Sequence, residues 1–273
     1  MKHALARVFV NGSLAWMAAC AVLPLAWMLS VSFMQPAAAD GLPPALVPLH
    51  PTLENYRALF AQTGMGRYMF NSLLVATLTT LVSLAFNLSA GYAFAKLRFA
   101  GRERIFHALV GALLMPAQVA MMPLFLLLKW MGLVNTYFGV MAPMLVTIFG
   151  IFMVRQYTRA LPDELLEAAR MDGASEGRIF VRIVLPLIKP IIVTLAVFTF
   201  LASWNDFMWP LIILTGQEHY TLPVALAVLS REHAQDTGQM MAGAVVTMLP
   251  VLVLFVALQR HYIQGLLLGS LKG

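Results

Sequence analysis

Residues 167–190 read EAARMDGASEGRIFVRIVLPLIKP and form a charged segment between two apolar runs. Seven of these 24 residues are charged, whereas only 11% of the whole chain is charged and 60% is hydrophobic. Charged side chains are costly inside a bilayer and accumulate in the loops that face water. We therefore expect this segment to lie outside the lipid and to present a surface on which another protein docks.

The composition of the 273-residue chain indicates an integral membrane protein, because the apolar share of soluble domains is typically about half. The single cysteine, Cys20, excludes a disulfide within the chain and a paired-cysteine metal or redox motif. His107, His233 and His261 are not spaced as metal ligands, so no metal site is expected. No combination of nucleophile, base and orienting group stands out, and we predict no catalytic residue.

Six apolar runs are long enough to cross a bilayer, which takes about 20 residues for roughly 30 Å of hydrocarbon. They cover approximately residues 13–33, 68–95, 105–128, 130–154, 190–214 and 239–259. Helices are expected because a segment in lipid must satisfy its own backbone groups, and these runs are too long for barrel strands. The sequence thus predicts an all-α membrane fold with six transmembrane helices, the third kinked at Pro116 and Pro123.

The first span has a competing interpretation as a signal peptide. Lys2 and Arg7 precede the apolar run, and residues 37–39 are three alanines that resemble a signal-peptidase site. The run is longer than the apolar core of an ordinary signal peptide, which is about 7–15 residues. We therefore expect the mature chain to keep this helix.

The positions of lysine and arginine predict the orientation in the membrane. If the N-terminus is cytoplasmic, 14 of the 18 lysines and arginines fall in inner segments, and the outer segments keep only Arg57, Arg67, Lys129 and Arg231. Both termini and the 167–190 segment are then expected in the cytoplasm. The net charge of +6 reflects this topology and contact with anionic membrane lipid, which argues against a nucleic-acid-binding protein.

A helix is predicted to begin near Pro162, immediately before the charged segment. Proline suits a first helical position, and Asp163 and Glu164 follow in the first turn, where carboxylates favour the positive end of the helix dipole. Three- and four-residue spacings place several residues, mostly small, on one stripe of this helix, and such a stripe lets another surface approach closely. These residues are Leu165, Ala168, Ala169 and Asp172.

A second short helix is predicted after a glycine corner. Gly173 suits the left-handed end of the first helix, and Ser175 is placed to cap the next one. The second helix presents an aromatic and aliphatic face that includes Phe180, and Pro186 is expected to end or kink it. This face, with Ile183 and Val184, indicates a docking surface; the alternative is that the helix pair packs on its own membrane domain.

These residues resemble the EAA loop of permease subunits in binding-protein-dependent ABC importers. The residues that carry the resemblance are Glu167, Ala168, Ala169, Asp172, Gly173, Ala174, Ser175, Phe180, Ile183, Val184, Leu185 and Pro186. Further matches are residues 132–136 (GLVNT), 161–164 (LPDE) and 204–206 (WND). Together they are similar to the sugar-importer branch of the family, and within it to the smaller, maltose-type permease.

The resemblance implies a type I ABC importer fold and a division of the chain into three parts. Residues 1–66 would hold the first transmembrane helix and an extracytoplasmic loop, and residues 67–260 the permease domain with its EAA loop at 156–189. Residues 261–273 would form a cytoplasmic tail that contacts the ATPases or is disordered. The implied location is the cytoplasmic membrane of a bacterium or archaeon.

The resemblance also implies that the chain works only in an assembly. The expected partners are a second permease subunit, an ATPase homodimer and an extracytoplasmic solute-binding protein. The sequence has no phosphate-cradling GxxxxGK[ST] loop, so ATP and Mg²⁺ would be used by the ATPases, and this chain would be a non-enzymatic subunit without a cofactor. The helix around Gly173 would be the coupling helix, with Glu167 in ionic contact with an ATPase.

Four residues are candidates for contact with the substrate or the pore: Trp204, Asn205, Asp206 and Asn87. Carboxylate and amide groups can hydrogen-bond sugar hydroxyls, and tryptophan can stack on a sugar ring. The alternatives are structural. Asp206 would cap a neighbouring helix, the tryptophans would lie at the membrane interface, and Asn87 would bond between helices.

The expected cargo is a sugar or oligosaccharide, because the interiors of the predicted spans contain no lysine or arginine that would bind a phosphorylated ligand. Glycerol phosphate, its diesters and polyols remain alternatives, since a partner permease could supply such charges. Two other classes of protein remain open at this stage. A secondary transporter would work without an ATPase, and a membrane-embedded enzyme would need a catalytic cluster.

Overall fold

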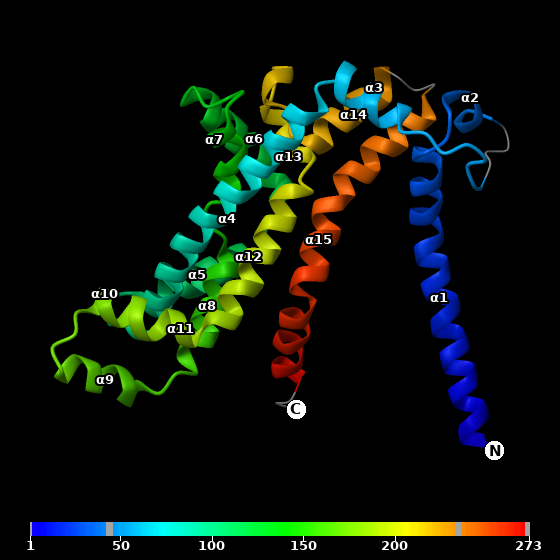
Figure 1. Cartoon of the computed structure of the whole chain (residues 1–273). Coiled ribbons are helices and arrows are strands. Elements are labelled where there is room, and N and C mark those ends of the chain that lie inside the picture. Colours follow the sequence, from blue (N-terminus) through cyan, green and yellow to red (C-terminus); the bar gives the residue numbers. More distant parts are fainter. Residues whose placement is uncertain (1, 42–45, 233–235, 271–273) are drawn as a thin grey trace. The chain divides into compact units, whose positions relative to one another are not determined.

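The computed structural model describes residues 2–41, 46–232 and 236–270, and every secondary-structure element in these ranges is a helix (Figure 1). The predicted all-α fold is confirmed. His233 lies outside the described residues, as do the side chains of His261 and of the predicted tail. The division at residues 66 and 260 stays a prediction.

Three helices are long and apolar enough to cross a membrane, with spans at Phe9–Ser32, Met65–Lys96 and Thr237–Ala257. Three further candidates are helix pairs bent at a short break, and counting each pair as one span gives up to six. The bends measure 103° within Arg102–Trp130, 46° within Tyr137–Arg159 and 81° within Glu176–Trp204. The bends interrupt the third and fourth predicted spans, whereas the 81° bend lies at Ile188, just before the fifth predicted span. That span is instead divided between two helices, Lys189–Trp204 and Met208–Ile213.

The chain divides into two compact units, and two of the three boundaries between them fall inside long helices, α4 (Met65–Lys96) and α15 (Thr237–Ser270). The first unit comprises residues 1–69 and 222–250, and the second comprises residues 70–221 and 251–273. Besides parts of α4 and α15, the first unit contains α1 (Lys2–Ser32), α2 (Pro36–Ala39), α3 (Glu54–Gln62) and α14 (Leu222–Glu232).

In the first unit, the end of α1 is tied to α3 through a buried amide. Asn55 Nδ2 donates to the carbonyl oxygens of Ser32 and Met34 at 3.0 and 2.8 Å. Most of α1 before this point carries apolar side chains that the chain itself leaves exposed, such as Trp16 at 71%. Exposed apolar side chains along a whole helix are typical of a surface that lipid or another chain covers.

The second unit carries the remaining helices. They are α5 (Arg102–Ala112), α6 (Ala117–Trp130), α7 (Tyr137–Met141), η1 (Ala142–Met144), α8 (Ile148–Arg159), α9 (Asp163–Met171), α10 (Glu176–Ile179), η2 (Phe180–Val184), α11 (Leu185–Leu187), α12 (Lys189–Trp204), α13 (Met208–Ile213) and η3 (Gln217–His219). Within this unit, α9 and α10 lie at one end of α4, α8 and α12, and α7 and α13 lie at the other end (Figure 1).

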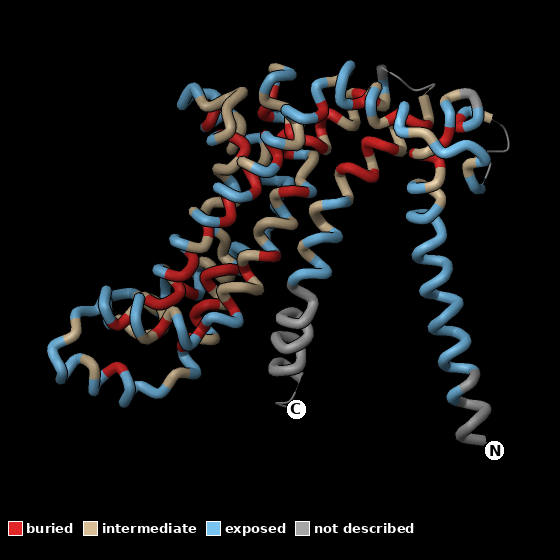
Figure 2. Tube along the Cα trace, in the orientation of Figure 1, coloured by how far each residue is buried: buried red, intermediate tan, exposed pale blue. Residues whose placement is uncertain are grey.

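The core of the second unit lies between α4, α8 and α12, where Tyr92, Val154 and Ile191 belong to one buried cluster (Figure 2). Gly91 allows the close approach of α4 to α8, because a Cβ atom built there would lie 2.5 Å from Val154 Cβ. Larger side chains at this position would push the helices apart.

Pro116 explains the break between α5 and α6. It has an extended conformation (φ −60°, ψ 130°) and precedes the first residue of α6. Pro123 lies inside α6 and does not end it. The interruption predicted at the first of these prolines is thus confirmed, whereas the second proline is accommodated within a helix.

Candidate functional site

The charged segment forms a helical hairpin made of α9, a glycine turn and α10. Pro162 is the residue before the first helical turn, in which Asp163 and Glu164 lie. Gly173 has φ +77°, and the amide of Ala174 beyond it donates to the carbonyl of Ala169 at 3.0 Å. The predicted helix start and left-handed glycine corner are both present, since each follows from local backbone chemistry.

Leu166 anchors helix α9 to the buried core of the second unit, and this residue was not predicted from the sequence. Leu166 is 1% exposed and belongs to the cluster that also contains Ile179 and Val184. Ala169, one turn later, packs against the same cluster. The periodicity of α9 could have identified this face, since Leu166 and Ala169 are three residues apart.

The opposite face of α9 and the turn are exposed to solvent in this chain. Glu167, Ala168, Met171, Asp172 and Gly173 are all exposed, with Met171 at 88%. We call these five residues the α9 surface. It combines two carboxylates, a methionine and two small residues.

The second half of the hairpin differs from the sequence prediction in how it begins and ends. Ser175 occupies the capping position of α10, but its side chain accepts no capping hydrogen bond. Pro186 does not end the helix, because the bend lies at Ile188 between α11 and α12. The turn before Pro186 is a π-helix, η2, a wider winding that accommodates the absence of an amide hydrogen on proline.

The aromatic and aliphatic face of the second helix packs on the chain's own core, which is a correction to the predicted docking face. The ring of Phe180 lies 5.1 Å from that of Tyr92, and Ile183 and Leu185 pack against the same buried cluster. Val184 is fully buried. The apolar stripe of the second helix faces α4 and α8, where it is buried. The outward-facing residues of the hairpin therefore come from α9 and the turn.

Two polar ties connect the hairpin to the end of α4. Tyr92 Oη donates to Glu176 Oε2 at 2.6 Å, and Glu176 Oε1 accepts from Arg170 Nε at 2.7 Å. Lys96 Nζ donates to Asp163 Oδ1 at 2.6 Å. This hydrogen bond lowers the pKa of the exposed Asp163 carboxyl, because it stabilises the ionised form of that carboxyl. Both ties were missed because the partners are far apart in sequence.

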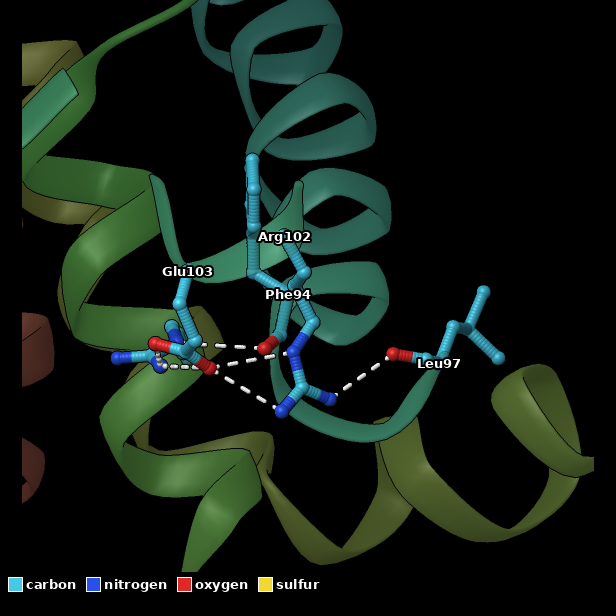
Figure 3. A network of polar contacts seen from close by, with 5 residues as sticks. Phe94, Leu97, Arg102 and Glu103 are labelled. Atoms are coloured by element: carbon cyan, nitrogen blue, oxygen red, sulfur yellow. Dashed lines mark hydrogen bonds and ion pairs between the residues drawn. The ribbon is translucent and has the colours of Figure 1, made fainter. Parts of the chain in front are cut away.

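A third polar network holds α8 where it leads into the hairpin (Figure 3). Glu103 of α5 accepts from Arg155 of α8 and from Arg102, whose guanidinium also donates to the Leu97 carbonyl at 3.0 Å. Arg155 Nε donates to the Phe94 carbonyl of α4 at 3.2 Å. The position of Arg155 after an apolar run indicated only an inner-facing charge, so its partners were not predictable.

The second group of predicted site residues lies between α12 and α13. Asp206 Oδ1 accepts from the Trp209 amide at 3.4 Å and so caps the start of α13. Asn205 is exposed, and its Nδ2 donates to the Leu201 carbonyl. Trp204 is 1% exposed and stacks on Phe200, so its ring is not open to a ligand in this structure. The geometry favours the capping alternative for Asp206, whereas Trp204 is buried within the chain, and its predicted place at the membrane interface stays a prediction.

Asn87 joins α4 to the break before α8. Its Nδ2 donates to Ser83 Oγ at 2.9 Å and to Thr147 Oγ1 at 3.0 Å, and its Oδ1 accepts from the Thr147 amide at 3.0 Å. The side chain is 2% exposed. Its amide is therefore engaged in holding an interrupted helix, as the structural alternative described.

Comparison with known proteins identifies relatives along most of the chain. Residues 87–267 match the model of the family described as binding-protein-dependent transport system inner membrane component. The chain is 37% identical over 262 residues to the arabinooligosaccharides transport system permease protein AraQ of Halalkalibacterium halodurans, covering 95% of this chain and 94% of that protein. It is 35% identical to the lactose transport system permease protein LacG of Rhizobium radiobacter, with 80% of each chain covered.

Solved structures show the same fold. A chain of a bacterial ABC transporter involved in the import of the acidic polysaccharide alginate superposes with a TM-score of 0.86 at 23% identity, covering 95% of this chain and 97% of that chain. A second alginate transporter structure, in complex with an alginate pentasaccharide-bound periplasmic protein, gives a TM-score of 0.67 at 15% identity. From the match over residues 87–267 and these relatives, the chain belongs to the family of binding-protein-dependent transport system inner membrane components.

Proposed function

We propose that this chain is a permease subunit of an ATP-driven importer for a sugar or oligosaccharide, and that it forms half of the translocation pore. The family and the carbohydrate permeases among the relatives support this function. Each bent helix pair then counts as one span, which gives six transmembrane helices with both termini in the cytoplasm. The chain itself carries no catalytic step and no cofactor.

The observation that carries the mechanism is the α9–α10 hairpin, which exposes the α9 surface while its other face is fixed to α4, α8 and α12. In this proposal the hairpin is the EAA loop, and α9 with the Gly173 turn inserts into a cleft of a separate ATPase subunit. The core contacts of Leu166 and Phe180 make the hairpin move with the membrane helices. ATP-driven closure of the ATPases would therefore rotate these helices and open the pore outward.

The proposed assembly contains a second permease, two ATPases that use ATP and Mg²⁺, and an extracytoplasmic binding protein that delivers the solute. The periplasmic protein bound in one of the similar structures supports the last of these partners. Selectivity resides mainly in the binding protein.

The experiment is co-purification of the tagged chain with its ATPase from membranes, combined with ATP-dependent uptake in proteoliposomes. Glu167→Lys reverses a charge on the α9 surface and should abolish ATPase recovery while the chain remains inserted. Glu54→Lys makes the same change on exposed α3 and should leave recovery unchanged. Full ATPase recovery with Glu167→Lys would contradict the docking role, and uptake without ATP would indicate a secondary transporter.

Contact of Asp206 with the substrate can be separated from its capping role by two substitutions. Asp206→Asn keeps the oxygen that accepts from the Trp209 amide, whereas Asp206→Ala removes it. If the charge contacts the sugar, Asp206→Asn loses uptake at unchanged melting temperature. If the residue only caps α13, Asp206→Asn transports normally and Asp206→Ala lowers the melting temperature.

A further inference from the structure

A groove of about 720 Å³ separates the end of α4 from α9. Eight of its eleven lining residues are charged. The lining residues are Ala95, Lys96, Leu97, Arg98, Arg102, Arg159, Asp163, Leu166, Glu167, Arg170 and Glu176. All of them belong to the second compact unit, so the groove is a feature of one body.

Five of the lining residues are cations and three are carboxylates, and most of them neutralise one another. Lys96 pairs with Asp163 at 2.6 Å, and Arg170 pairs with Glu176 at 2.7 Å. Arg102 pairs with Glu103, a residue outside the groove lining, at 3.1 Å. These pairs account for three cations and two lining carboxylates.

Arg98 and Arg159 form no ion pair and no side-chain hydrogen bond with any residue that the structure describes. Both are exposed, and both line the same groove. Glu167 is the remaining lining carboxylate, and it likewise has no ion-pair partner in the described part of the chain. The unpaired charges thus sum to an excess of one positive charge, which an anion can neutralise.

The chemistry and the place of this excess favour a phosphate group. Guanidinium groups offer planar pairs of N–H donors that match phosphate oxygens, and two of them can share one phosphate. Ala95 and Lys96 lie at the end of α4, where its apolar span stops. In the proposed orientation this is the depth at which the headgroups of anionic lipids lie, and their surface attracts arginine.

We propose that this groove is a phosphate-binding site, with Arg98 and Arg159 as the two ligands. The phosphate is carried either by the headgroup of an anionic phospholipid or by a free phosphate ion. The inference rests on the proposed function for the side of the membrane on which the groove lies. Occupancy joins the α4–α5 connection to Arg159, the last residue of α8, and so adds a phosphate-dependent tie close to the start of α9 at Asp163.

The test uses the delipidated, purified transporter complex and native mass spectrometry of bound ligand. Three probes separate the sources: dioctanoyl phosphatidylglycerol carries a lipid phosphate, inorganic phosphate carries a free one, and dioctanoylglycerol carries none. Phosphatidylglycerol or phosphate should bind and dioctanoylglycerol should not. Whichever phosphate probe binds identifies the source, and binding of neither overturns the proposal.

Four variants test the residues. Arg98→Gln and Arg159→Gln should each weaken binding of the phosphate probe about five-fold or more, since an arginine near an anionic headgroup contributes about 1 kcal/mol. Arg104→Gln removes the same charge from the first turn of α5, outside this groove, and should change binding less than about two-fold. Glu167→Gln removes the opposing carboxylate and should strengthen binding.

An equal loss with Arg104→Gln would indicate diffuse attraction and would overturn the site, as would unchanged binding in the double variant Arg98→Gln/Arg159→Gln. Arg98→Lys/Arg159→Lys keeps the charge and tests the need for the planar donors. The two proposals are tested by separate measurements. ATPase recovery with Glu167→Lys tests docking, and retention of the phosphate probe in the arginine variants tests the groove.

Discussion

Arg155 Nη2 donates to both carboxylate oxygens of Glu103, at 3.0 and 2.8 Å, and joins α8 to the start of α5. The arginine side chain is 5% exposed, whereas that of Glu103 is 48% exposed. The guanidinium carbon also lies 3.8 Å from the centroid of the Phe106 ring. A buried cation is thus enclosed by a carboxylate, a backbone carbonyl and an aromatic face at the point where α8 enters the hairpin.

Removal of the Glu103 carboxylate should destabilise the chain because it leaves Arg155 buried without a counter-charge. We expect Glu103→Ala to lower the melting temperature, by less than the loss of a fully buried pair would, because Glu103 itself is half exposed. Thermal unfolding in detergent measures the loss. The double variant Glu103→Ala/Arg155→Met should cost less than the sum of the single changes, and strict additivity would show that the two residues are not coupled.

A methyl group at Gly91 should force α4 away from α8, because the added Cβ atom would lie 2.5 Å from Val154 Cβ. Gly91→Ala should therefore lower thermal stability, by about 1–3 kcal/mol as for other overpacked cores. Val154→Ala creates the missing space, so the double variant should be more stable than Gly91→Ala alone. Absence of this rescue would show that the helices do not approach at these two residues.

The left-handed conformation of Gly173 predicts an order of tolerance at the turn. A Cβ atom at this position meets no other atom within 4 Å, so the only penalty is backbone strain at φ +77°. Asparagine adopts this region readily and valine does not. Gly173→Asn should keep most of the ATPase recovery, and Gly173→Val should lose it. Equal recovery with the two variants would mean that the turn conformation is unimportant for docking.

We expect substitution of Asn87 to affect the stability of the fold rather than the binding of the substrate. Asn87→Leu leaves the Thr147 amide without its acceptor, and an unsatisfied buried group costs about 1–3 kcal/mol. We expect the melting temperature and uptake to fall together, with an unchanged KM in the fraction that remains folded. A raised KM at unchanged stability would instead place Asn87 in the substrate path.

The features that the sequence predicted correctly depend on neighbours within a few residues. Pro162 and Gly173 define the ends of α9 through their own backbone preferences, and the apolar runs define candidate spans through length alone. The direction in which Phe180 faces depends on α4, a helix that is distant in sequence. Glu103 lies 52 residues from Arg155, and Thr147 lies 60 residues from Asn87, so no local pattern reveals these two pairs.

The break at Thr147 was also outside the reach of hydropathy. It interrupts an uncharged, largely apolar run, and hydropathy measures the composition of a run rather than its straightness. Thr147 begins α8 by accepting from the Gly150 amide, a local signal that an apolar average conceals. The substrate candidates show the same limit, because the burial of Trp204 depends on how α12 is rotated.

The ties of Tyr92 to Glu176 and of Lys96 to Asp163 give the hairpin a mechanical character. They fasten both of its legs to α4, while the polypeptide itself continues into α8 and α12. A force applied at Gly173 is therefore shared among three helices, and only two of them receive it through covalent bonds. The hairpin is thus braced by side-chain contacts as well as by the chain, so a torque that the proposed ATPase applied to it would act on α4 as well as on α8 and α12.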